Sequence, residues 1–138
     1  MNKQNIVFAD TSFFKGLIDV GDDFHEQAKS SWQRLEEEDA TIIISNYVLD
    51  ESFTLIRLRC GIKIVDQFRD DIIKSSHVIK IVRVTVADEA QAWKWFLNDW
   101  SKLSFTDCVS FAVMKRLDIK RVATFDEHFN RAGFTLIN

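Results

Sequence analysis

The chain has 138 residues, of which 46% are hydrophobic, and a formal net charge of −3. This length favours a single domain, residues 1–138, and the acidic balance argues against a protein that coats nucleic acid through bulk positive charge. No stretch approaches the roughly 20 apolar residues of a membrane span, and the first residues lack a secretory signal pattern, so we expect a cytoplasmic protein without a membrane partner.

Apolar runs of strand length alternate with helical patterns along the chain. The runs predict strands at residues 6–9, 41–44, 78–86 and 121–125, with a further short strand at 134–137. Two helical patterns each carry an apolar face, formed by Phe24, Ala28, Trp32 and Leu35 within 22–39, and by Ala90, Trp93, Phe96, Leu97 and Trp100 within 88–100. This alternation predicts an α/β fold with a mainly parallel sheet of four to five strands, covered by helices on both faces.

Two carboxylates lie directly beyond predicted strands. Asp10 follows the first strand in "NIVFADTSFF", and Asp126 follows the fourth in "RVATFDEHF". Functional groups in an open parallel sheet collect beyond the carboxyl ends of the strands, so both acids are candidate site residues. Each also has a structural interpretation, because Asp10 fits a helix cap and Thr124-x-x-Glu127 fits a capping box around Asp126.

A third candidate acid lies in the helix predicted after the second strand. At helical spacing Glu51 lines up with the apolar residues Val48, Leu55 and Leu58, whereas its neighbour Asp50 falls on a polar side. A carboxylate on a face that points to the core is costly unless a cation or hydrogen-bond donors compensate it. We therefore expect Asp50 at the surface and Glu51 in a site.

A fourth acid, Asp107, lies in the first turn of a strongly apolar helix that runs to about Leu117. Ser104-x-x-Asp107 fits a capping box, and the helix macrodipole favours an acid at this end, so Asp107 alone has a structural explanation. Four acids at one edge of the sheet, two at strand ends and two in early helix turns, are harder to explain as helix caps alone.

A cluster of carboxylates favours a particular chemistry. Such groups repel one another, so they persist at neutral pH by sharing protons or by binding a cation. Oxygen ligands suit Mg²⁺ or Mn²⁺, and these ions activate water and stabilise charge in phosphodiester hydrolysis. The pattern therefore predicts a metal-dependent phosphodiesterase.

Neighbouring polar residues leave alternatives open. Thr11 and Ser12 either orient ligands at the site or cap the first helix, and His128 either flanks the site or packs elsewhere. The separated Cys60 and Cys108 indicate neither a zinc site nor a disulfide framework. The basic segment 57–83, with seven Lys/Arg and three Asp/Glu, fits either solvated helix faces or a surface that contacts phosphates.

Other phosphoryl-transfer folds require residues that this sequence lacks. Haloacid-dehalogenase-type phosphatases need a second Asp where Ser12 stands, and receiver domains need an acidic pair where Asp10 stands alone. The sequence also contains no P-loop, no GxGxxG pattern and no nucleophile elbow.

Four segments in order resemble the PIN-domain ribonucleases, especially the VapC-type toxins of prokaryotic toxin–antitoxin modules: "VFADTSFF", "SNYVLDESFTLIR", "LSFTDCVSFAVMKRLDI" and "RVATFDEHFNRAGF". The resemblance implies a three-layer α/β/α fold and maps the family's catalytic, metal-holding acids onto Asp10, Glu51, Asp107 and Asp126. In the family these acids hold one or two Mg²⁺ or Mn²⁺ ions for RNA cleavage.

The resemblance also implies partners, namely an RNA substrate, a small antitoxin protein and a second copy of the chain in a homodimer. Residues 61–100 match the family only in their general helix–strand–helix pattern, which leaves the RNA target open. Two alternatives remain at this point. One is a PIN-like nuclease of DNA or of RNA maturation without a toxin role, and the other is a non-catalytic binding module whose acids are only caps.

Overall fold

A computed structural model describes residues 5–137 of the chain; the expected domain also includes residues 1–4 and 138, which lie outside the described residues. Its centre is a five-stranded sheet in the order β3-β2-β1-β4-β5. Every strand pair is parallel, as the apolar strands predict. The strands are β1 (Ile6–Ala9), β2 (Thr41–Ser45), β3 (Ile79–Val82), β4 (Arg121–Ala123) and β5 (Thr135–Leu136).

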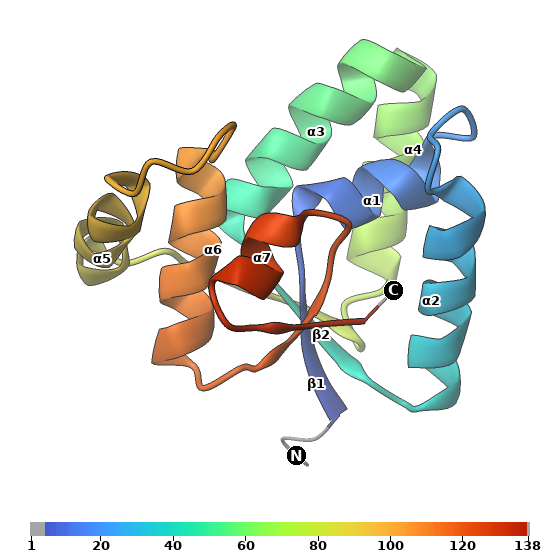
Figure 1. Ribbon diagram of the computed structural model, residues 1–138. Helices are drawn as coiled ribbons and strands as arrows, with labels where there is room; N and C mark the ends of the chain where they lie inside the picture. The colour runs from blue at the N-terminus through green and yellow to red at the C-terminus, as the bar shows by residue number, and fades with distance from the viewer. Residues whose placement is uncertain (1–4, 138) are drawn as a thin grey trace.

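Helices cover both faces of the sheet. They are α1 (Thr11–Ile18), α2 (His25–Glu37), α3 (Asn46–Cys60), α4 (Ile62–Lys74), α5 (Val86–Phe96), α6 (Phe105–Arg116) and α7 (Glu127–Arg131). With right-handed crossovers, the strand order places α1 to α4 on one face and α5 to α7 on the other. Figure 1 shows α5 and α6 on the opposite side of the sheet from α2 and α4. The expected three-layer α/β/α fold is confirmed.

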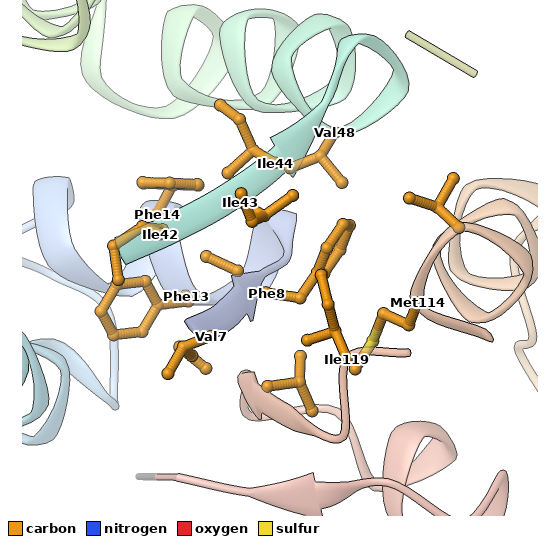
Figure 2. Close-up of a cluster of buried hydrophobic side chains, with 14 of the residues drawn as sticks. Val7, Phe8, Phe13, Phe14, Ile42, Ile43, Ile44, Val48, Met114 and Ile119 are labelled. Carbon is orange, nitrogen blue, oxygen red and sulfur yellow. The ribbon is translucent and has the colours of Figure 1, made fainter. Parts of the chain in front are cut away.

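The core lies between the sheet and both helix layers. Val7, Phe8 and Ala9 of β1 are completely buried, which a central strand covered on both faces requires. Figure 2 shows Phe8 beside Met114 and Ile119, which belong to the α6 side of the core. The strands are thus fixed by burial of their side chains, and this fixes where their carboxyl ends lie. Within residues 5–137, no helix combines the length and apolar character needed to cross a membrane.

The strand expected at 78–86 is shorter than the sequence predicts. It ends at Val82, and Val86 instead begins α5. The reason is local, since Thr85 and Asp88 form a reciprocal capping box that starts a helix at this point. The fourth strand likewise ends at Ala123 rather than at residue 125.

The buried face of α5 also differs from the expectation. Trp93 and Leu97, expected in the core, are 54% and 69% exposed, while Asp88 and Ala92 are buried. The helix turns an acid inward because Arg116 of α6 meets Asp88 with two hydrogen bonds of 2.9 Å each. Burial raises the pKa of Asp88, but the Arg116 pair and the Thr85 hydrogen bonds outweigh it and hold the pKa below its ordinary value. Of the apolar face expected on α2, Ala28 and Leu35 are buried and Phe24 is 43% exposed.

The Asp88–Arg116 pair gives a prediction about stability. Arg116→Met leaves a buried carboxylate without its partner, and we expect a loss of on the order of 3 kcal/mol in the free energy of unfolding. Lys120→Met is the matched control, because Lys120 pairs with Asp118 at the exposed surface, where an ion pair contributes less than about 1 kcal/mol. Urea unfolding of both variants measures the difference. Equal small losses would contradict this account of how α5 is held.

Candidate active site

Parallel pairing of β1 with β4 places two polar segments side by side. Ala9 is in register with Ala123, and the Asp10 N–H donates to the Ala123 carbonyl at 3.2 Å. The residues that follow these strands, Asp10 on one and Thr124 to Asp126 on the other, therefore leave the sheet together. β1 has β2 on one side and β4 on the other, so the strand order reverses between β1 and β4. Open α/β sheets place their sites at the carboxyl ends of such a strand pair.

Asp10 is a buried carboxylate, only 4% exposed, with three hydrogen-bond donors around it. It caps α1 by accepting from the Phe13 N–H at 3.2 Å. The hydroxyls of Ser12 and Thr124 each donate to it at 2.8 Å. Burial nevertheless raises the pKa of Asp10 to about 7, because the hydrogen bonds offset only part of the lost hydration. Asp10 therefore caps α1, which was one of its two predicted roles, and its part in a site stays a prediction.

The hydroxyls of Ser12 and Thr124 hold this corner of the site together. The Phe125 N–H donates to Ser12 Oγ, and the Asp126 N–H donates to Thr124 Oγ1, both at 3.0 Å. Ser12 thus orients Asp10, while the Thr11 hydroxyl is buried and forms no hydrogen bond within residues 5–137. The capping box expected between Thr124 and Glu127 does not form. Thr124 bonds across to Asp10 instead, a role that sequence spacing alone did not indicate.

Asp107 lies at the start of α6, where the expected capping box is confirmed. Ser104 Oγ accepts from the Asp107 N–H at 3.0 Å, and the Ser104 N–H donates to the carboxylate at 3.4 Å. Burial, together with the negative charges of Asp126 and Asp10, raises the pKa of Asp107 to about 8. Asp107 and Asp126 lie beside the His128 ring, with carboxylate oxygens 3.8 Å and 3.0 Å from its Nδ1, so two acids from separate parts of the sequence meet here, and the charge of Asp10 acts on the same group.

Asp126 and His128 complete this cluster from α7. Asp126 caps the helix by accepting from the His128 N–H at 2.9 Å. One ligand atom from each of Asp107, Asp126 and His128 can be chosen so that all three lie within 4.8 Å of one another. Of the two roles left open for His128, the structure favours the first, because it sets the ring beside Asp107 and Asp126, and a part in the site stays a prediction.

Glu51 is positioned less directly. It lies in the second turn of α3, whose cap is Ser45, and it is half-buried while Asp50 is exposed as expected. The residues of α3 that face the core are Val48, Ser52 and Ile56, and Leu58 is 72% exposed, so the apolar stripe expected through Leu58 is wrong. Within residues 5–137 no hydrogen bond or ion pair joins Glu51 to the other three acids. α3 packs against α1, which Asp10 caps, and against α6, which contains Asp107.

The donors of this site fit a divalent cation. Carboxylate oxygens are the ligands of Mg²⁺ and Mn²⁺, and a cation would offset the burial and repulsion that raise the pKa values of Asp10 and Asp107. The buried Nδ1 of His128 forms no hydrogen bond within the described residues, which leaves a ligand atom at the cluster. The arrangement is therefore chemically suited to metal-assisted hydrolysis.

Comparison with known proteins agrees with this geometry. The family model described as "PIN domain" matches residues 7–135. The proteins named 23S rRNA-specific endonuclease VapC20, from two strains of Mycobacterium tuberculosis, are 37% identical over 130 residues, which cover 94% of this chain and 95% of theirs.

Solved structures give the same result for the fold. The crystal structure of Mycobacterium tuberculosis VapC20, described as a sarcin–ricin loop cleaving toxin, has a TM-score of 0.82 at 36% identity and covers 94% of this chain and 96% of its own. FitAcB from Neisseria gonorrhoeae, with a TM-score of 0.68 and 18% identity over 96% of both chains, shares the fold. The chain therefore belongs to the PIN-domain family and is of the VapC type.

Proposed function

We propose that this protein is a Mg²⁺- or Mn²⁺-dependent endoribonuclease and the toxin of a toxin–antitoxin pair. The observation that carries the proposal is the cluster of the buried Asp10 and Asp107 with the half-buried Asp126 at the carboxyl edge of the sheet. Three acids at this edge repel one another. A bound cation would offset that repulsion, whereas an apolar ligand or a covalent nucleophile would not. The 37% identity to proteins named as endonucleases of 23S rRNA supports RNA as the substrate.

Each acid has a role in this proposal. Asp107 and Asp126 hold the cation, Asp10 contributes from the end of β1, and Glu51 approaches from α3 as the fourth carboxylate. A bound Mg²⁺ or Mn²⁺ supplies Lewis-acid chemistry for hydrolysis of a phosphodiester. Ser12 and Thr124 are positioning residues, because they reach the reaction only through their hydrogen bonds to Asp10.

The part of the basic segment 57–83 around the turn between α3 and α4, with Arg57, Arg59 and Lys63, supplies a surface for RNA phosphates. All seven cationic side chains of the segment are exposed: Arg57, Arg59, Lys63, Arg69, Lys74, Lys80 and Arg83. Figure 1 shows the turn between α3 and α4 rising on the side toward which β1 points its carboxyl end. Cations are required there because an acidic site repels the RNA backbone. By similarity to VapC20, 23S ribosomal RNA with its sarcin–ricin loop is the first substrate to examine.

The catalytic role of the acids can be tested by substitution, with the neighbour of Glu51 as a control. Glu51→Gln and Asp107→Asn are expected to lower cleavage of ribosomal RNA by at least about 100-fold, since each removes a charge that holds the cation. Asp50→Asn, one residue from Glu51 and exposed, is the control and should cleave like the wild-type protein. Primer extension on 23S rRNA in the presence of Mn²⁺ measures the rate and the cleaved position. Full activity in Glu51→Gln would remove Glu51 from the site.

Metal binding should be opposed by protons. Asp10 and Asp107 have folded-state pKa values of about 7 and 8, above the ordinary value of 3.8, so the metal-free folded protein binds more protons than the unfolded chain between about pH 4 and pH 8. Stability without metal therefore falls as the pH rises through this window, and stabilisation by Mn²⁺ grows over the same range.

Asp107→Asn removes one of these titrating groups. We expect the metal-free variant to gain on the order of 4 kcal/mol over wild type as the pH rises from about 5 to about 8, and to lose most of the Mn²⁺ effect. Denaturant unfolding at several pH values, with EDTA or with Mn²⁺, measures both. A variant that is less stable than wild type at about pH 8, with no response of either protein to metal, would instead favour a binding module whose acids are only caps.

The toxin role and the partners rest on the family. We propose a cytoplasmic homodimer that a small antitoxin holds inactive. Expression of the chain alone should arrest growth, coexpression with the small protein encoded beside it should relieve the arrest, and light scattering should give twice the chain's mass. Cleavage without growth arrest would favour a nuclease of RNA maturation.

A further inference from the structure

His128 is held in one tautomer by a backbone carbonyl. Its Nε2 lies 2.9 Å from the Ser101 carbonyl oxygen, which can only accept a hydrogen bond. Nε2 therefore carries the proton in the neutral ring, and Nδ1 presents a lone pair. Histidines that ligate metals commonly donate their other ring N–H to a carbonyl in this way.

The Nδ1 atom faces the acidic cluster without a hydrogen bond of its own. It is buried, and it lies 3.0 Å from Asp126 Oδ1 and 3.8 Å from Asp107 Oδ2. Asp126 Oδ1 already accepts the backbone N–H of His128 at 2.9 Å. In the neutral ring this lone pair thus has no hydrogen-bond donor within residues 5–137, although buried polar atoms normally have a partner.

Aromatic packing fixes the ring in this position. The imidazole stacks on the Trp100 indole with centroids 6.1 Å apart and planes at 19°, and the Arg131 guanidinium lies 4.5 Å from the centre of the same indole. A ring held from one side by stacking and from another by Ser101 has little freedom to turn Nδ1 away. The nitrogen is therefore pre-oriented toward the two carboxylates.

We propose that His128 Nδ1 is a direct ligand of the divalent cation, together with Asp107 and Asp126. This inference rests on one part of the proposed function, namely that a divalent cation binds at this site. Ligand atoms bonded to one ion at about 2.1 Å lie about 3 to 4.2 Å apart, a spacing that the three side chains reach with small adjustments. An imidazole in the donor set favours Mn²⁺ and later transition metals over Mg²⁺, relative to a site of oxygens alone.

The competing explanation is an ion pair, in which a protonated His128 only neutralises Asp126. Pulsed EPR of Mn²⁺ bound to the full-length protein separates the two, because only a directly bonded imidazole gives a strong ¹⁴N coupling. We expect that coupling in the wild-type protein and its replacement by a ¹⁵N pattern after labelling with ¹⁵N-histidine, which leaves the fold unchanged.

Variants assign the signal to one residue among the three histidines. The double variant His25→Asn/His77→Asn should retain the coupling, and His128→Asn should lose it and weaken Mn²⁺ binding by about tenfold or more, with a smaller effect on Mg²⁺. Bound Mn²⁺ without nitrogen coupling would overturn this inference and leave the proposed nuclease intact. Absence of Mn²⁺ binding to wild type would overturn both, and loss of the coupling in the double variant would assign it to another histidine.

Discussion

The parallel pairing of β1 with β4 is the constraint on which the site depends. It sets Ala9 beside Ala123, so that Asp10 and the Thr124 to Asp126 segment leave the sheet at the same point although they are more than 100 residues apart in sequence. Burial of β1 on both faces prevents a shift of register, because a slip of one residue would turn its apolar side chains to the wrong layers. The geometry of the acids follows from the packing of the core.

Helix capping and the acidic cluster are two consequences of the same residues. Asp10 and Asp126 cap α1 and α7, and Asp107 completes the capping box of α6. Three helix N-termini, each with a partial positive charge, thereby meet the acids at one edge and offset part of their mutual repulsion. The offset is incomplete, as the raised pKa values of Asp10 and Asp107 show, and the remaining imbalance is what a cation would relieve. Capping and a place in the candidate site, which looked like alternatives in the sequence, are therefore compatible in the same residues.

Local sequence patterns predicted the positions of helices and strands better than they predicted which face of a helix is buried. The existence of the five strands and the capping box at Ser104 follow from short-range propensity and are confirmed, although the third and fourth strands end earlier than expected. The inward face of α5 does not follow, because Asp88 is buried only in the presence of Arg116, a partner from another helix. The stripe on α3 fails for a similar reason, since Leu58 lies beyond the part of the helix that other elements cover.

The sequence by itself determined the fold class, the family and the acids that follow its strands, because burial, capping and motif order act over short stretches of chain. Only the tertiary structure decided which side chains meet. It joined Thr124 to Asp10, brought His128 to Asp107 and Asp126, and left Glu51 half-buried on α3 without a direct bond to the other acids. These contacts depend on strand register and on the docking of separate helices, and neither is encoded in the spacing of residues along the chain.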